Sequence, residues 1–146
     1  MRLSTKCRYG TRALLEIGRN YGHGPVKRKD IAKAQDLSRS YIENILITLK
    51  SKKILKTTRG ADGGFELLRM PAQINLYQVV TALEGSITPV DCIEDDHACN
   101  RDVKKCVARR AWLKLHEAQV AALTAITLQD LLDWEKEDNK ALNYAI

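Results

Sequence analysis

Three of the four cysteines in this 146-residue chain, Cys92, Cys99 and Cys106, lie evenly spaced within a stretch of fifteen residues. Thiolates are the usual ligands of iron–sulfur clusters, which normally take four of them, with histidine or another group replacing some in certain centres. The spacing matches neither the short cysteine pairs of zinc sites nor the closely spaced runs of ferredoxins. The pattern therefore favours an iron–sulfur cluster, with a zinc site completed by His97 and a set of redox thiols as the alternatives.

The sequence leaves the fourth ligand of such a site open. His97 lies inside the stretch and is the nearest suitable group. Cys7 is distant in sequence, but the first helix of a second chain could bring it close, and its alternative interpretation is a small buried thiol. Carboxylates are the remaining candidates: Asp91, Glu94, Asp95 and Asp96.

The bulk composition, with 45% hydrophobic and 29% charged residues, is that of an ordinary soluble protein with one core and an appended element. No apolar run approaches the length of a membrane span, and charged residues interrupt the first twenty positions, where a signal peptide would need an apolar core. We therefore expect a cytoplasmic protein, whose thiols stay reduced and whose clustered cysteines serve metal or redox chemistry.

The net charge of +6 is divided unevenly along the chain. Residues 1–70 hold 16 Lys and Arg against 6 Asp and Glu, whereas residues 71–146 hold 8 against 12. A basic half joined to an acidic half indicates a polyanion-binding module fused to an element with another role.

The basic half carries the pattern of a helix-turn-helix. A short helix is expected over residues 26–37, with a turn at Asp36, a residue type that tolerates a left-handed backbone. Ser38 or Ser40 begins the next helix, and Ser40 with Glu43 fits a capping box. Its inner stripe is Ile42, Ile45, Leu46 and Leu49, and its outward residues are Arg39, Ser40, Glu43 and Asn44. This polar outward face suits DNA docking, and a small helical core is the alternative.

A hairpin follows the second of these helices. Two short expected strands, residues 55–59 and 65–68, flank the glycine-rich tip at residues 60–64. After a helix-turn-helix, such a hairpin is a wing, and Arg59 at the edge of its tip could enter a minor groove. Residues 1–70 are therefore predicted to form a winged helix-turn-helix DNA-binding domain, which begins with a helix capped by Ser4 or Thr5.

The second half divides into a linker with a connecting helix (residues 71–91), the cysteine loop (92–106), a long helix (104–126) and a C-terminal helix with a tail (127–146). Asn75 caps the connecting helix and Gly85 ends it. The last helix is expected to be short, with a frayed polar tail from Lys136.

The long helix carries a stripe of mostly small residues: Val103, Val107, Ala111, Leu115, Ala118 and Ala122. Antiparallel pairing of this helix with that of a second chain is the interpretation favoured, and packing onto its own domain is the alternative.

Four segments, spread over nearly the whole chain, form a specific combination: Met1-Arg-Leu-Ser-Thr-Lys6, Leu37-Ser-Arg-Ser-Tyr-Ile-Glu43, Arg59-Gly-Ala-Asp-Gly-Gly-Phe65 and Pro89-Val-Asp-Cys-Ile93. This combination resembles the bacterial IscR/NsrR family of winged-helix iron–sulfur regulators, and most closely its IscR-type branch. The resemblance implies a mainly α-helical fold with a small β-hairpin and a long dimerisation helix. It also implies a homodimer that binds a two-fold symmetric operator in double-stranded DNA.

The resemblance also implies the site residues. The DNA contacts would map to Ser38, Ser40, Tyr41, Glu43, Asn44 and Arg59, with Arg39 on the same helix end. The cluster ligands would be Cys92, Cys99 and Cys106, holding a two-iron (2Fe-2S) cluster in preference to a four-iron one. The chain departs from the IscR-type pattern at Arg109, where relatives place a histidine ligand, and from the nitric-oxide branch at Arg8, where relatives place an acidic ligand.

The resulting hypothesis is a transcription regulator, usually a repressor, that senses iron–sulfur cluster status and controls the genes of cluster biogenesis. The alternatives are a regulator of the same fold that senses zinc, nitric oxide or oxidants, and a redox-thiol or electron-transfer protein with a basic docking face. Catalysis is not expected, because the residue pattern contains no Ser/His/Asp or paired-carboxylate arrangement.

Overall fold

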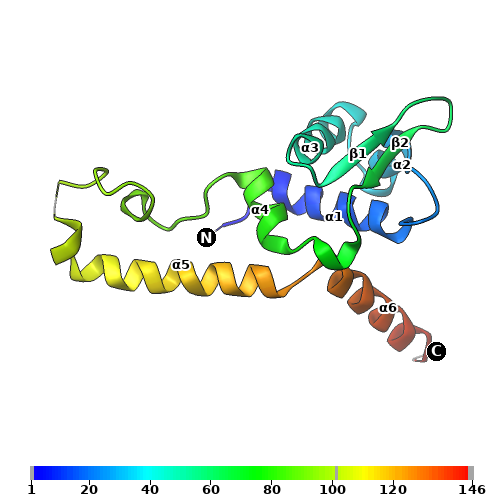
Figure 1. The fold of residues 1–146 in the computed structure, drawn as a ribbon. Coiled ribbons are helices and arrows are strands. Elements are labelled where there is room, and N and C mark those ends of the chain that lie inside the picture. Colours follow the sequence, from blue (N-terminus) through cyan, green and yellow to red (C-terminus); the bar gives the residue numbers. More distant parts are fainter. Residues whose placement is uncertain (1, 101, 145–146) are drawn as a thin grey trace.

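The computed structural model describes residues 2–100 and 102–144, which form six α-helices and one two-stranded hairpin. The elements follow the order α1 (Thr5–Arg19), α2 (Arg28–Ala34), α3 (Arg39–Ser51), β1 (Leu55–Thr58), β2 (Gly64–Leu67), α4 (Leu76–Glu84), α5 (Val107–Ala125) and α6 (Leu128–Tyr144). Short 3₁₀ turns occupy Pro71–Gln73, Asp91–Ile93 and Val103–Lys105. Figure 1 shows α1 to α4 and the hairpin gathered at one end, with α5 extending away from them. The predicted fold class is confirmed.

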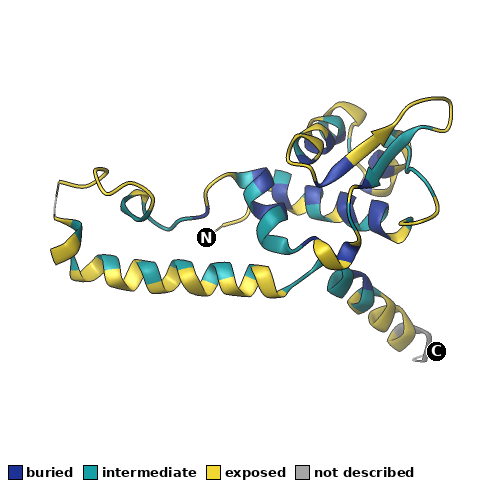
Figure 2. Cartoon of the chain, viewed as in Figure 1, coloured by how far each residue is buried: buried dark blue, intermediate teal, exposed yellow. Residues whose placement is uncertain are grey.

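The core forms where α1 packs against α3 and α4, as the dark segments of Figure 2 show. Close approach of α1 and α4 depends on Gly10, where an added Cβ would lie 2.4 Å from Leu83 Cδ1. The inner stripe predicted for α3 is buried as expected. Its members are Ile42, Ile45, Leu46 and Leu49.

The helix-turn-helix forms for local reasons. Helix α2 begins after Lys27, whose side chain makes no capping hydrogen bond, and it is only seven residues long. Asp36 adopts the predicted left-handed backbone, with φ 52°, and turns the chain toward α3. Ser38 caps α3, because its Oγ accepts a hydrogen bond from the Tyr41 N–H at 3.3 Å. Ser40 lies within the helix, so the prediction of a Ser40–Glu43 capping box was wrong.

The wing is a two-stranded antiparallel hairpin that a third segment extends. Strands β1 and β2 pair in the register Leu55↔Leu67 to Thr58↔Gly64. Val26 pairs with Phe65 through two backbone hydrogen bonds of 2.9 Å, so the residues before α2 lie against β2. A Cβ at Gly64 would lie 2.4 Å from the Val26 carbonyl oxygen, so this approach depends on glycine.

Backbone contacts join the start of α4 to the segment between the C-terminal end of α5 and the start of α6. Asn75 caps α4 in a capping box with Gln78, and Gly85 ends the helix at φ 88°, both as predicted. An isolated bridge pairs Asn75 with Thr127. Two backbone hydrogen bonds of 2.8 Å flank this bridge, from the Leu76 N–H to the Ile126 carbonyl and from the Leu128 N–H to the Ile74 carbonyl. These bonds fix the point at which α5 passes into α6.

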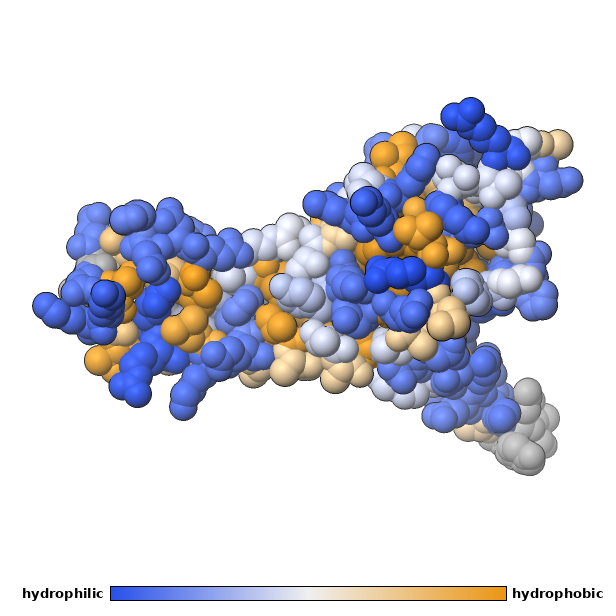
Figure 3. All heavy atoms as spheres, in the orientation of Figure 1, coloured by the Kyte–Doolittle hydropathy of each residue, from blue (hydrophilic) through white to orange (hydrophobic). Residues whose placement is uncertain are grey.

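Helix α5 is the most exposed of the regular elements. None of its residues is buried. The helix contacts α4 and the turn at Asp91–Ile93, and its residues Val107, Trp112 and Leu115 are 77%, 42% and 43% exposed. In Figure 2, α5 alternates between exposed and intermediate positions, and Figure 3 shows hydrophobic atoms at the surface at the end of the molecule that carries the cysteine loop.

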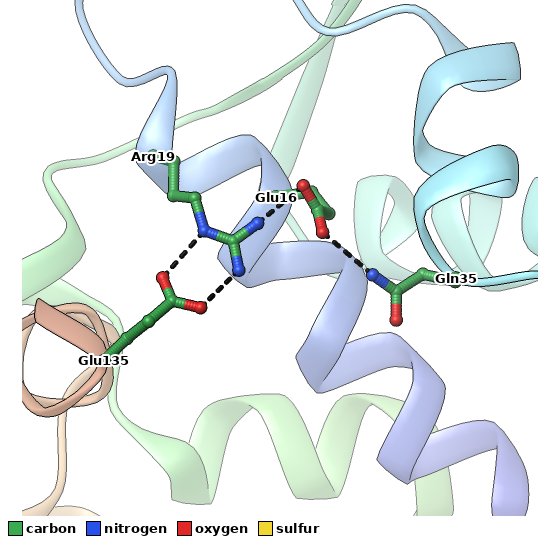
Figure 4. A network of polar contacts seen from close by, with 4 residues as sticks. All are labelled: Glu16, Arg19, Gln35 and Glu135. Atoms are coloured by element: carbon green, nitrogen blue, oxygen red, sulfur yellow. Dashed lines mark hydrogen bonds and ion pairs between the residues drawn. The ribbon is translucent and has the colours of Figure 1, made fainter. Parts of the chain in front are cut away.

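Helix α6 differs from its prediction, since it runs to Tyr144 and the expected frayed tail from Lys136 is helical. Its start is fixed by Thr127 and Asp130, whose side chains each accept the other's backbone N–H. A polar network holds it to α1 (Figure 4): Arg19 contacts Glu135 of α6 and Glu16 of its own helix, and Glu16 accepts from Gln35 at 3.0 Å. Among the described residues, no helix is long and apolar enough to cross a membrane.

Candidate nucleic-acid interface and cysteine loop

The outward end of α3 presents the residues expected to contact DNA. Ser38, Arg39, Ser40 and Asn44 are exposed, while Tyr41 and Glu43 are half-buried. The hydroxyls of Ser38 and Ser40 lie 3.3 Å apart, so they form one polar patch at the N-terminus of the helix. Serine hydroxyls and an asparagine amide can bond either bases or phosphates, which makes this patch suited to a major groove.

The two half-buried members of this set have partners within the protein. The Tyr41 ring meets Tyr9 edge-on, with centroids 6.3 Å apart, and the Arg12 guanidinium lies 5.5 Å from the centre of the Tyr9 ring. Glu43 forms an ion pair with Arg28, the first residue of α2. Tyr41 therefore has a packing role beside any contact with DNA, and the carboxylate of Glu43 is already held by a cation.

The wing presents Arg59 as predicted. Arg59 follows β1 directly and is exposed, as are its neighbours Gly60, Ala61 and Asp62. The Lys27 ammonium lies 3.1 Å from the Asp62 carboxylate, which ties the tip of the wing to the residue before α2. Arg59 is thus carried on a hairpin that Val26 contacts at Phe65, near the tip end of β2, and that Lys27 contacts at Asp62.

Reasoning from the sequence missed three residues of this surface: Lys27, Arg28 and Ile47. The contacts of Lys27 and Arg28 join segments that are far apart in the chain, and no local sequence pattern predicts such pairs. Ile47 could have been found, because it lies three positions after Asn44 on the outward side of the α3 pattern. It is 53% exposed and could meet a thymine methyl group.

The cysteine loop, residues 92–106, connects the two short turns that precede α5. Cys92 lies in the Asp91–Ile93 turn and Cys106 immediately precedes α5, and both are half-buried. Cys99 lies between them and is exposed. All four cysteines of the chain are free thiols.

Arg109 links the two ends of this loop. Its Nε donates to the Cys92 carbonyl oxygen at 2.9 Å, and its Nη2 lies 2.7 Å from the Asp96 carboxylate. Arg109 is in the first turn of α5, three residues after Cys106. The residue that replaces the expected histidine therefore bonds the loop instead of serving as a ligand.

The donor set fits an iron–sulfur cluster in its chemistry, because three free thiols lie on one solvent-accessible loop. In the described part of the chain, no group of three or more His, Cys, Asp or Glu side chains is gathered as a metal site. Binding of a cluster would therefore require the loop to bring its sulfurs together. His97 is exposed on this loop, and its backbone N–H donates to Asp95 at 2.9 Å.

Cys7, the other candidate for a fourth ligand, lies in a different environment. Its side chain is fully buried in the core of α1. Burial, together with the neighbouring Glu84 carboxylate, raises the pKa of the Cys7 thiol to about 11. A thiol that resists ionisation is a poor metal ligand, so its surroundings favour a packing role.

Comparison with known proteins places these features in a family. Residues 3–134 match the family model Rrf2, described as an iron-dependent transcriptional regulator. The chain is 35% identical to a putative HTH-type transcriptional regulator of Synechocystis and 32% identical to the HTH-type transcriptional regulator CymR of Bacillus subtilis, with full coverage of both chains in each case.

Two solved structures share the architecture at a similar identity. The structure of B. subtilis CymR, the global cysteine regulator, has a TM-score of 0.75 at 33% identity and covers 92% of this chain and 98% of its own. The structure of T. potens IscR has a TM-score of 0.76 at 31% identity, and the match covers 94% of this chain and 90% of the IscR chain. Since both matches cover more than nine-tenths of this chain, and the family model spans residues 3–134, the chain belongs to the Rrf2 family of DNA-binding transcriptional regulators.

Proposed function

We propose that this regulator senses iron–sulfur cluster status through Cys92, Cys99 and Cys106 and acts as a repressor of cluster-biogenesis genes. The observation that carries the proposal is the position of the three free thiols, on one accessible loop that Arg109 fastens to the start of α5. A cluster of the 2Fe-2S type is favoured, with His97 as the nearest candidate for a fourth ligand.

The proposal includes a homodimer. The exposed side of α5 carries Val107, Ala111, Leu115, Ala118 and Ala122. Small residues allow two such helices to approach closely, and antiparallel pairing would bury the stripe on both chains. Two recognition helices related by a two-fold axis would then read a symmetric operator, with Ser38, Arg39, Ser40, Tyr41, Glu43, Asn44 and Arg59 at the DNA.

The connection between cluster and DNA would run through α5. The cysteine loop lies beside the start of this helix, and α4 packs between α5 and the winged domain. Closing the loop around a cluster would change the contacts at the start of α5, and through the dimer it would bias the spacing of the two recognition helices.

Anaerobic reconstitution with iron and sulfide tests the cluster. The expected result is visible charge-transfer absorption, with iron and acid-labile sulfide bound in proportion to the chains. Cys92→Ala, Cys99→Ala and Cys106→Ala should each lose most of this absorption, whereas the control Cys7→Ala should keep it. A colourless wild-type protein, or an undiminished spectrum from Cys92→Ala, would refute the cluster.

A second candidate is a thiol-based sensor on the same fold. Two observations favour it: Cys99 is exposed on its loop, and one similar solved structure is that of a global cysteine regulator. In that case the reconstituted protein would hold no iron, and treatment with hydrogen peroxide would change operator affinity in the wild type but not in Cys99→Ser. Metal analysis also separates both candidates from a zinc site.

A further inference from the structure

Three residues around the start of α2, Val26, Lys27 and Arg28, contact the wing and the recognition helix α3 of the winged domain. Val26 pairs with Phe65 in the wing, and Lys27 reaches Asp62 at the wing tip. Arg28 forms its ion pair with Glu43 on the recognition helix. Residues 26–28, which we call the junction segment, therefore connect the wing to α3 without belonging to either.

The Arg28–Glu43 pair has a consequence for a surface that binds phosphates. A carboxylate near a polyanion is repelled, so an unpaired Glu43 would turn away from the duplex or weaken binding. Arg28 offsets this charge and restricts the rotamers of the glutamate side chain. Both side chains are 42% exposed, so the pair is open to the solvent on the DNA side of α3 and not sealed in the core.

We propose that Arg28 is a positioning residue for base recognition: it holds the Glu43 carboxylate at the angle required to accept a hydrogen bond from a cytosine amino group. The proposal rests on the proposed role of Glu43 in DNA reading. A carboxylate that accepts from cytosine N4 discriminates that base from others by about 5- to 150-fold. Arg28 controls this discrimination without touching the base.

A different role for Arg28 would leave a different signature. If Arg28 only contacted a phosphate, its loss would weaken binding to all sequences alike and reduce the salt dependence of binding. If it only supported the fold, its loss would lower the thermal stability while base preference stayed the same. Base preference, measured in the presence and absence of Glu43, therefore separates the positioning role from the other two, which differ from each other in salt dependence and thermal stability.

The experiment begins with selection of duplexes from a randomised library by the full-length wild-type protein, followed by single base-pair substitution of the selected site. At the position read by Glu43, the preference for a cytosine should fall several-fold in Arg28→Ala and recover in part in Arg28→Lys. In the Glu43→Ala background, Arg28→Ala should have no further effect on that preference. Lys29→Ala is the matched control, because Lys29 is exposed in the same turn and has no ion pair among the described residues.

The outcomes are distinct. If the wild-type protein bound its selected site and Arg28→Ala kept the same base preference at every position, the proposal would be overturned. The proposed function as a regulator would be unaffected by that result. An equal loss of affinity for all sequences in Arg28→Ala, with Glu43 present or replaced by alanine, would overturn it as well, in favour of a phosphate contact. If the wild-type protein selected a site but Glu43→Ala kept all base preferences, then the role of Glu43 itself, on which the proposal rests, would be wrong.

Discussion

Single residues of the same type have different chemistry in this molecule because their surroundings differ. Cys7 and Cys99 are both free thiols, yet Cys7 is fully buried beside Glu84 and Cys99 lies exposed on its loop. The pKa of the Cys7 thiol rises from its ordinary 9.0 to about 11, with burial as the main cause. At neutral pH the thiolate fraction of Cys7 is therefore lowered about 100-fold, and the thiolate is the reactive form.

Alkylation of the reduced, cluster-free protein with iodoacetamide should reflect this difference. We expect Cys99 to react first and Cys7 to remain unmodified when the loop cysteines are fully labelled, as followed by peptide mass spectrometry. In denaturant the four thiols should react at similar rates, which serves as the control. Labelling of Cys7 as fast as Cys99 in the folded protein would contradict its burial.

Gly63 and Gly64 are wing glycines at which an added Cβ would meet backbone atoms, and Gly64 is the one that lies against the segment before α2. An alanine Cβ there would lie 2.4 Å from the Val26 carbonyl oxygen, a backbone atom that cannot move without breaking the Val26–Phe65 pair. Gly64→Ala should lower the free energy of unfolding by about 1–3 kcal/mol, measured by urea denaturation. Gly18→Ala is the comparison, since its Cβ would lie 3.2 Å from the tip of a leucine side chain, and the substitution should cost much less.

At the scale of elements, α6 is held by polar contacts as much as by apolar packing. Leu128 and Leu132 are buried, while Trp134 is 48% exposed. The Arg19 guanidinium makes two hydrogen bonds to Glu135, and these bonds hold the pKa of the Glu135 carboxyl below its ordinary 4.5. Because the pair is partly exposed, its contribution to stability is about 1 kcal/mol or less.

Glu135→Gln should therefore destabilise the protein by that small amount at neutral pH, and the effect should depend on pH. The folded-state pKa of Glu135 is depressed, so its contribution is complete above about pH 5 and is lost as the pH falls through the folded value. The difference between the thermal melts of wild type and variant should shrink as the pH falls below the ordinary value of 4.5 and through the depressed folded-state pKa. A constant difference across this range would show that the Arg19 pair is not its source.

Local signals in the sequence were sufficient for the starts and ends of several helices. The Ser4 cap, the Asn75 capping box, the Asp36 turn and the end at Gly85 each depend on residues within one turn of the chain. The full length of α6 could not be predicted in this way, because Glu135, midway along the helix, is held by Arg19, more than a hundred residues earlier. The ion pair of Arg28 and the bonds of Arg109 are non-local in the same sense.

The cysteine loop shows the same limit at the candidate site. The types and spacing of three thiols could be read from the sequence, but their relative positions depend on how Arg109 folds the loop against α5. Even spacing along the chain does not gather side chains in space, and within the described residues the sulfurs are not grouped. Ligand chemistry was therefore more predictable than ligand geometry.

At the scale of the whole molecule, the exposed side of α5 is the surface most in need of a partner. Leu115 lies near the middle of its stripe and is 43% exposed in the single chain. Leu115→Asp should convert the proposed dimer to a monomer in sedimentation analysis and reduce operator affinity by at least about 10-fold, because two half-sites would no longer be bound together. Lys114→Asp, which changes an exposed neighbour, should leave the dimer intact. A dimeric Leu115→Asp protein would mean that another surface joins the chains.

The backbone bonds at Asn75–Thr127 and Leu76–Ile126 fasten one end of α5, and the other end carries the cysteine loop. If its end at the core is taken as a pivot, this helix is a lever about 28 Å long, at about 1.5 Å per residue. A displacement of a few ångströms at the far end becomes a tilt of several degrees at the pivot. Under the proposed function, chemistry at the outermost sulfurs would therefore act with mechanical advantage on the winged domain.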